Sequence, residues 1–250
     1  MNAAIRVEAL KLARSPVGTI GTIALVAGTL ALLGGITAAL AGGNPELIAK
    51  VGTAGTLNWR GLLAATAQIT AAGGLLGFGV VLSWIFGREF TDGTITGLFA
   101  LPISRARIAL AKLAVYGVWA CAVSLILALG ILALGLILGY GAPTADAWAG
   151  LGRQGVLAVL TAAIAVPAAW IATVTRSLLA AVGGTIALVI IAQVGALAGA
   201  GGWMPLAAPA LWAMSEGAAV SAAQLALAVL LGIVFVAFTS AAWARLQLNR

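Results

Sequence analysis

Six of the nineteen charged side chains fall in one stretch of the sequence, GREFTDGTITGLFALPISRARIALAK, residues 87–112. It contains two carboxylates, Glu89 and Asp92, and Arg88 stands beside the first. Such groups form charge-assisted hydrogen bonds with oppositely charged groups of a partner. Gly93 follows them, and a residue without a Cβ atom lets another backbone approach closely. The residue types in this stretch are therefore suited to contact with a partner, and equally to a solvated surface.

The groups on which most enzymes depend are missing from the sequence. It has no histidine, which excludes His-dependent hydrolases, haem sites and most zinc enzymes. Its single cysteine, Cys121, offers neither a disulfide within the chain nor a Cys-based metal site. No G-x-x-x-x-G-K-[ST] motif occurs to hold nucleotide phosphates. We therefore expect that this chain is not an enzyme and binds no metal or cofactor itself.

The composition indicates a membrane protein. Hydrophobic residues make up 63% of the chain, charged residues only 8%, and the mean hydropathy is +1.16. Continuous apolar runs predict helical spans, since the strands of a barrel would alternate apolar and polar residues. The six runs cover about 17–41, 61–86, 113–138, 154–175, 178–198 and 222–243. We expect one all-α transmembrane domain over 1–250, its first run being too long for a signal peptide.

Residues 199–221 are apolar but interrupted by Pro205 and Pro209, so they make a poor seventh span. They also contain Trp203 and Trp212, a residue type that settles at the level of the lipid headgroups. We expect a re-entrant or interfacial segment between the fifth and sixth spans, and hence an even number of crossings.

The distribution of cations predicts the orientation in the membrane. With a cytoplasmic N-terminus, ten cations lie inside: Arg6, Lys11, Arg14, Arg88, Arg105, Arg107, Lys112, Arg176, Arg245 and Arg250. Three lie outside: Lys50, Arg60 and Arg153. The positive-inside rule therefore places both termini in the cytoplasm. Because the cations flank apolar runs, the net charge of +7 does not indicate a nucleic-acid-binding surface.

The charged stretch does not cross the membrane, because inserting six charges would cost about 15 kcal/mol. Within it, Ile95, Leu98 and Phe99 recur at helical spacing, while Glu89 and Asp92 fall largely on other faces. This pattern predicts a short helix lying along the membrane surface.

A second helix is expected to follow that surface helix. Pro102 ends the first helix, and Ser104 is placed to cap the next one, which runs into the third span. Arg105, Arg107 and Lys112 would then lie against anionic lipid phosphates. The residues alone leave two interpretations open: a solvated loop whose cations set topology, or a docking element for a cytoplasmic partner.

The order of Glu89, Gly93–Thr94, Leu98, Pro102, Ser104–Arg105 and Lys112 resembles the pattern between the second and third spans of ABC-2 type transporter permeases. These are six-span membrane subunits of ATP-binding-cassette exporters. The resemblance extends to the layout of the whole chain. It implies that the N-terminal stretch IRVEALKLARSP forms an interfacial elbow helix.

The resemblance also implies a coupling helix that docks on a separate nucleotide-binding ATPase. The docking residues it implies are Arg88, Glu89, Asp92, Gly93, Thr94, Pro102, Ser104 and Arg105. Glu89 would pair with an arginine of the partner, and Glu89→Lys would uncouple ATP hydrolysis without unfolding the chain. Two ATPase copies carrying ATP and Mg²⁺ would act on two permease copies, most simply a homodimer, in the cell membrane of a bacterium.

The cargo of such an exporter would be a lipid, an amphipathic peptide or a hydrophobic drug, since the spans offer little charge to an ionic substrate. Gln68 and Gln193 lie deep in the second and fifth spans and are candidates for the pathway; either could instead hydrogen-bond a neighbouring helix. The glycines of these spans, at 73, 74, 77, 79, 183 and 184, fit close helix packing better than a ligand site.

Two other classes of transporter remain as alternatives. One is an ion-coupled secondary transporter, which usually needs carboxylates inside the membrane. All six acidic residues are expected at or outside the interfaces: Glu8, Glu46, Glu89, Asp92, Asp146 and Glu216. The other is a six-span substrate-capture subunit of an importer, which would not be expected to carry the pattern from Glu89 to Lys112.

Overall fold

The computed structural model describes residues 2–43, 55–99 and 102–247. In these ranges the chain is helical and has no strand. Six helices are long and apolar enough to cross a membrane: Pro16–Ala41, Trp59–Thr91, Arg105–Ile137, Ala145–Thr175, Leu178–Leu197 and Ala222–Ala244. The predicted all-α fold with six spans is confirmed.

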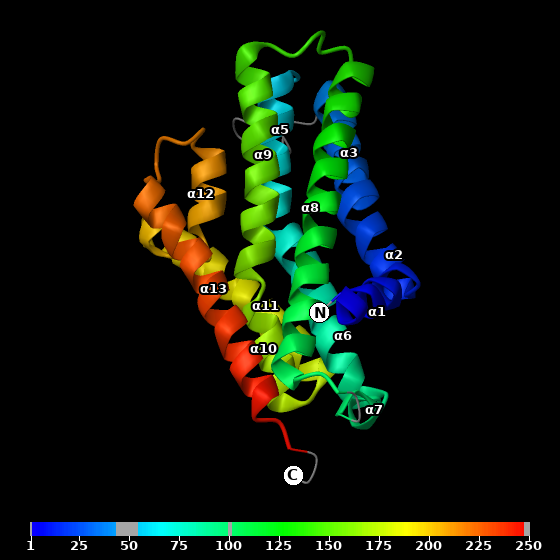
Figure 1. Ribbon diagram of the computed structural model, residues 1–250. Helices are drawn as coiled ribbons and strands as arrows, with labels where there is room; N and C mark the ends of the chain where they lie inside the picture. Colours follow the sequence, from blue (N-terminus) through cyan, green and yellow to red (C-terminus); the bar gives the residue numbers. More distant parts are fainter. Residues whose placement is uncertain (1, 44–54, 100–101, 248–250) are drawn as a thin grey trace.

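Three of these six spans consist of more than one helical element (Figure 1). The helix α1 (Asn2–Ala13) precedes the first span, which comprises α2 (Pro16–Ile23), the π-helical η1 (Ala24–Gly28) and α3 (Thr29–Ala41). The second span comprises α5 (Trp59–Ile69), the π-helical η3 (Thr70–Gly74) and α6 (Leu75–Thr91), and α7 (Ile95–Phe99) follows. The third is α8 (Arg105–Ile137), the fourth α9 (Ala145–Ile164) with α10 (Pro167–Thr175), and the fifth α11 (Leu178–Leu197). The 3-10 helix η4 (Gly201–Trp203) and α12 (Ala208–Met214) precede the sixth, α13 (Ala222–Ala244).

Three spans are longer than their apolar runs. The fourth begins at Ala145 instead of near 154, directly after its N-cap residue Thr144. The other two are the second and third spans. The second continues to Thr91 instead of ending near 86, and the third begins at Arg105 instead of near 113. Both extensions carry a charged side chain, Glu89 or Lys112, that is buried against the rest of the protein. A charged side chain that is paired inside the fold can be part of a helix. The end of an apolar run in the sequence therefore does not mark the end of the helix.

Local signals set most other helix ends. Thr144 and Ser177 accept hydrogen bonds from the first turns of α9 and α11, and Ser221 forms a capping box with Gln224. Pro167 begins α10 and divides the fourth span in two. Ser104 occupies the predicted N-cap position of α8, but its side chain makes no capping hydrogen bond.

The second and fourth spans form the centre of the bundle. In their apolar stretches 56% and 61% of the residues are buried, compared with 17% to 33% in the other four spans. The span α6 approaches α11 closely: a Cβ atom added to Gly79 would lie 2.3 Å from the Thr185 side chain, and one added to Gly87 would lie 2.8 Å from the Leu178 Cα. Glycine serves close packing at both positions, as the sequence predicted for Gly79.

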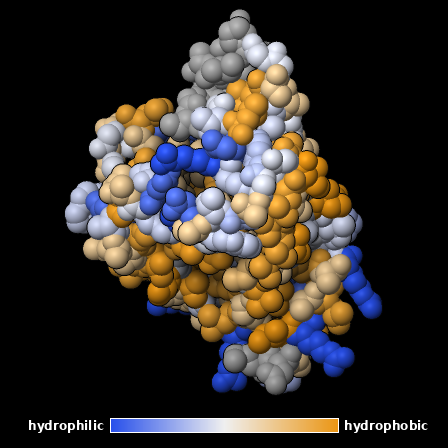
Figure 2. Space-filling view, turned by 90° about the horizontal axis from the view of Figure 1, so that it is seen from above, coloured by the Kyte–Doolittle hydropathy of each residue, from blue (hydrophilic) through white to orange (hydrophobic). Residues whose placement is uncertain are grey.

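The connections between spans lie at the two ends of the bundle (Figure 1). One end, the α7 end, holds α7, the start of α8, the turn between α10 and α11, and the last turn of α13. At the opposite end, α12 packs against α5 and α9. There Arg60 Nε lies 2.7 Å from Glu216 Oε1, an exposed pair that joins α5 to the connection between α12 and α13. Figure 2, which looks onto this end, shows hydrophilic groups gathered there above apolar flanks.

Candidate functional site

Four charged side chains from three helices meet near the α7 end, and together they are called the four-charge ring. Glu8 and Lys11 come from α1, Glu89 from α6 and Lys112 from α8. Lys112 Nζ lies 2.6 Å from Glu89 and 2.8 Å from Glu8, while Lys11 Nζ lies 2.9 Å from Glu89 and 3.2 Å from Glu8. Each lysine contacts both carboxylates, so positive and negative charges alternate around the ring and its net charge is zero.

The ring is buried on one side. The side chains of Lys112 and Glu89 are each 1% exposed and that of Glu8 is 6% exposed, whereas Lys11 is 28% exposed. Lys112 has three N–H donors, and its third acceptor is the carbonyl oxygen of Ile85, at 3.3 Å. Buried charges are tolerated where they are paired and hydrogen-bonded, and Lys112 meets this condition in full.

The outer lysine keeps its charge in this setting. Burial by itself lowers the pKa of Lys11, but the hydrogen bond to Glu89 and the charges of Glu8 and Glu89 outweigh it, so that the pKa is raised above its ordinary value. Lys11 therefore stays protonated at neutral and moderately alkaline pH.

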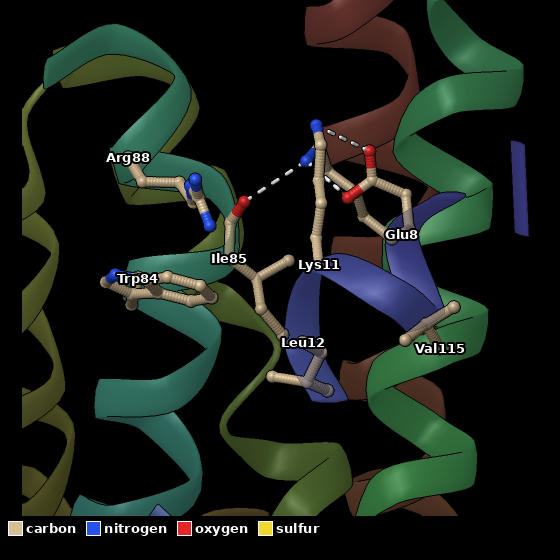
Figure 3. A pocket seen from close by; sticks show the side chains of 8 residues that line it. Glu8, Lys11, Leu12, Trp84, Ile85, Arg88 and Val115 are labelled. Carbon is tan, nitrogen blue, oxygen red and sulfur yellow. Dashed lines mark hydrogen bonds and ion pairs between the residues drawn. The ribbon is translucent and has the colours of Figure 1, made fainter. Parts of the chain in front are cut away.

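Helix α1 presents its two ring members by helical spacing. Glu8 and Lys11 are three residues apart and so share a face, which also buries Leu12. Figure 3 shows both charged side chains pointing to the space beside the Ile85 carbonyl. Ser15 then fixes the turn from α1 into the first span, since its hydroxyl donates to the Leu12 carbonyl at 2.8 Å and accepts from the Gly18 N–H at 2.8 Å.

The connection between α6 and α8 is attached to the ring through Thr94, whose hydroxyl donates a hydrogen bond to Glu89 Oε2. Gly93 has φ +67°, a left-handed value that lets the chain turn directly after α6. Thr94 also starts α7, because its carbonyl accepts from the Leu98 N–H at 3.2 Å. The residue that directly precedes α7 thus touches the ring.

The outer side of this connection is exposed, and its apolar side is not. Ile95 is buried, while Leu98 and Phe99 are half-buried against the core. The predicted apolar face of the short helix therefore exists, but it packs on the protein's own core. Asp92 is exposed and lies 3.6 Å from Arg88, whose guanidinium stacks 4.5 Å from the centre of the Trp84 ring (Figure 3).

Two arginines hold the end of α13 against this region. Arg105 donates to the carbonyl oxygen of Leu246 and stacks 4.0 Å from the centre of the Phe99 ring. Arg176, in the turn between α10 and α11, donates to the carbonyl oxygen of Gln247 at 2.9 Å. The segment after α13 thus contacts both the start of α8 and the turn between α10 and α11.

The family model described as ABC-2 family transporter protein matches residues 4–193, which include all four members of the ring and α7. The chain belongs to the ABC-2 family. This permease is therefore a multi-pass membrane protein and a transmembrane subunit of an ABC transporter. A comparison with curated proteins found no match.

The geometry of the permease corrects two expectations from the sequence. Glu89 does not offer its carboxylate to an arginine of a partner, because both of its oxygens are engaged by groups of the same chain inside the fold. Lys112 does not lie against lipid phosphates, since it is buried in the ring. Of the two carboxylates in the charged stretch, the exposed one belongs to Asp92.

The other predicted docking residues of the permease have different settings. Gly93, Pro102 and Ser104 are exposed. Thr94 is also exposed, although its hydroxyl bonds to Glu89. Arg105 contacts Leu246 and Phe99 of its own chain, and Arg88 pairs with Asp92. Among the predicted docking residues, the exposed ones are therefore Asp92, Gly93, Thr94, Pro102 and Ser104.

Sequence reasoning missed Glu8 and Lys11 as members of a site, although a signal was present. They stand three residues apart in a short amphipathic stretch, and Lys112 lies two turns inside a long apolar helix, where a charge usually needs a partner.

Glu46 falls outside the described residues. Across the described ranges no group of three or more metal-ligating side chains was found.

The two glutamines proposed for the pathway of the permease, Gln68 and Gln193, are both exposed on the outside of the single chain. Gln68 lies just before the π-helical turn η3. The glutamine that joins two spans in the interior is instead Gln154 of α9, which donates to Thr70 at 2.7 Å.

Proposed function

We propose that this permease is the membrane subunit of an ATP-driven exporter whose energy comes from a separate nucleotide-binding subunit. Permeases of this family generally work with an ATPase subunit, and the sequence has no nucleotide-binding loop of its own. The observation that carries the proposal is the hydrogen bond from Thr94 to Glu89, because it attaches an exposed connection to a buried contact between spans.

In this proposal α7 and the residues beside it form the coupling helix. Asp92 supplies an exposed carboxylate for a basic group of the ATPase, and Gly93 brings the backbone to the surface. The α7 end faces the cytoplasm, because its described cations outnumber those of the opposite end. They are Arg6, Lys11, Arg14, Arg88, Arg105, Arg107, Lys112, Arg176 and Arg245 against Arg60 and Arg153.

Two permease copies and two ATPase copies form the working complex, in the cell membrane of a bacterium. Gln68 and Gln193 face outward from the single chain, so a pathway that they line would run between two copies. In the described parts of the spans, the buried charges Glu89 and Lys112 are paired within the ring and offer a charged cargo no free partner. A lipid, an amphipathic peptide or a hydrophobic drug fits such a pathway.

The test is reconstitution of the permease with its ATPase in proteoliposomes, with ATP hydrolysis and cargo movement measured together. Asp92→Lys should weaken ATPase binding by about tenfold, because it places a like charge against a basic partner surface. The matched control is Asp146→Lys, which reverses an exposed carboxylate at the opposite end and should leave binding unchanged. Cargo movement driven by an ion gradient without any ATPase would refute the proposal in favour of a secondary transporter.

A further inference from the structure

We propose that Glu89 is a positioning residue that transmits the movement of α7 to α1 and α8, with Thr94 as the link. This inference rests on the proposed function, since it requires a partner that moves α7. It assigns the four-charge ring a role in coupling that is separate from binding the ATPase.

The first support is that the two carboxylate oxygens of Glu89 accept hydrogen bonds from different groups. Oε1 accepts from Lys112 at 2.6 Å and from Lys11 at 2.9 Å, while Oε2 accepts from Thr94. One side chain of α6 is thus bonded to α1, to α8 and to the start of α7. A displacement of Thr94 either moves Glu89 with it or breaks a charge-assisted hydrogen bond.

The second support is the stiffness of what lies beyond the ring. The helix α8 runs without interruption for 33 residues, about 50 Å, from the α7 end to the opposite end. Lys112 of this helix donates hydrogen bonds to three acceptors: Glu89, Glu8 and the Ile85 carbonyl. Helix α1 passes into the first span through the turn held by Ser15. A shift of the ring therefore reaches two spans besides α6.

The third support is the kind of contact that α7 makes elsewhere. Its inner face is apolar, with Ile95 buried and Leu98 half-buried in the core. These apolar contacts have little directionality, and the stacking of Arg105 on the Phe99 ring joins α7 only to the first turn of α8, outside the four-charge ring. The hydrogen bond of Thr94 has a fixed direction, and it joins α7 to the charged groups that connect three helices.

Thr94→Val tests the link without breaking the ring. Valine has nearly the shape of threonine but lacks the hydroxyl, and Glu89 keeps both lysines, so the fold should survive. Thr94→Ser is the matched control, because it keeps the hydroxyl. In reconstituted complexes we expect Thr94→Val to move about tenfold less cargo per ATP hydrolysed than the wild type. Thr94→Ser should transport nearly as the wild type does.

A structural readout separates the link from a general loss of activity. Spin labels at Leu10→Cys on α1 and Thr96→Cys on α7, both exposed positions, would report the distance between the two helices in a Cys121→Ser background. ATP binding should move both labelled helices together in the wild type. With Thr94→Val the distance between the labels should change on ATP binding, because α7 moves while α1 stays.

The outcomes separate this inference from the function beneath it. Full transport per ATP by Thr94→Val, with an unchanged distance between the labels, would show that the ring only stabilises the fold. Equal loss in Thr94→Val and Thr94→Ser would show that the hydroxyl is not the link. An absence of ATP-driven transport in the wild-type complex itself would refute the proposed function, and the inference would fall with it.

Discussion

The Nζ atom of Lys112 lies 2.6 Å from Oε1 of Glu89, and both side chains are 1% exposed. The two residues come from consecutive spans and are 23 positions apart in the sequence. The sequence predicted that the lysine contacts lipid and that the glutamate contacts a partner protein. In the structure the two residues instead pair with each other inside the bundle.

Lys112→Met should destabilise the permease by about 3–5 kcal/mol, because it leaves two buried carboxylates sharing only Lys11. The double variant Lys112→Met with Glu89→Met removes one charge of each sign and leaves the Glu8–Lys11 pair intact. It should therefore be more stable than Lys112→Met alone. Thermal unfolding of the purified protein in detergent measures both, with Arg107→Met, an exposed cation of the same helix, as the control. A single variant as stable as this control would contradict a paired, buried lysine.

Gly79→Ala should destabilise the contact between α6 and α11 by about 1–3 kcal/mol. The added Cβ atom would lie 2.3 Å from the Thr185 side chain, which also lies within hydrogen-bonding distance of Ser83, at 3.3 Å. Gly183→Ala is the matched control on the facing helix, because nothing lies within 4 Å of its added Cβ atom. The melting temperature should fall for the first variant alone; equal values for both would rule out tight packing at Gly79.

The pair of Arg60 and Glu216 should contribute little to stability. Both side chains are largely exposed, at 75% and 49%, and exposed ion pairs are screened by water and salt. We expect Glu216→Gln to shift the melting temperature by less than about 3 °C at neutral pH. A larger loss would mean that the contact is a structural joint of the fold.

The same pair should respond to acid in a defined direction. The hydrogen bond from Arg60, followed by its charge, lowers the pKa of Glu216 below the ordinary value of 4.5. A lowered carboxyl pKa means that the pair's contribution is present above pH 4.5 and is lost as the pH falls through the lower folded value. The difference in melting temperature between wild type and Glu216→Gln should therefore vanish in strong acid; a difference that grew there would contradict the sign.

Arg105→Gln should release the segment that follows α13. Arg105 donates to the Leu246 carbonyl, and losing a hydrogen bond from a charged group should speed trypsin cleavage after the exposed Arg245 by about tenfold. Arg107→Gln removes a neighbouring exposed cation and serves as the control. Mass spectrometry of the digested protein gives both rates, and equal rates would show that Arg105 does not hold the segment.

Local patterns were sufficient for the outline of this fold. Six apolar runs gave six spans, because the length of such a run and the cost of inserting charge are properties of neighbouring residues. The predicted start of α8 after Ser104 was confirmed for the same reason, as an N-cap position and a preceding proline act over a few residues. The pattern from Glu89 to Lys112 also pointed to the family, which the family match confirmed.

The roles of the charged residues could not be predicted in this way. A sequence shows that Lys112 follows Arg105 by two helical turns, but not whether that face of the helix meets lipid or another helix. The apolar limits drawn near 86 and 113 were wrong for a related reason, since burial by distant parts of the chain allowed Glu89 and Lys112 to stay helical.

The sequence by itself determined an all-helical permease with six spans, because hydropathy and capping are read from adjacent residues. Only the tertiary structure decided that Lys112 meets both Glu8, 104 positions away, and Glu89. A buried charge is stable only beside its counter-charge, and which counter-charge it meets depends on how whole helices pack.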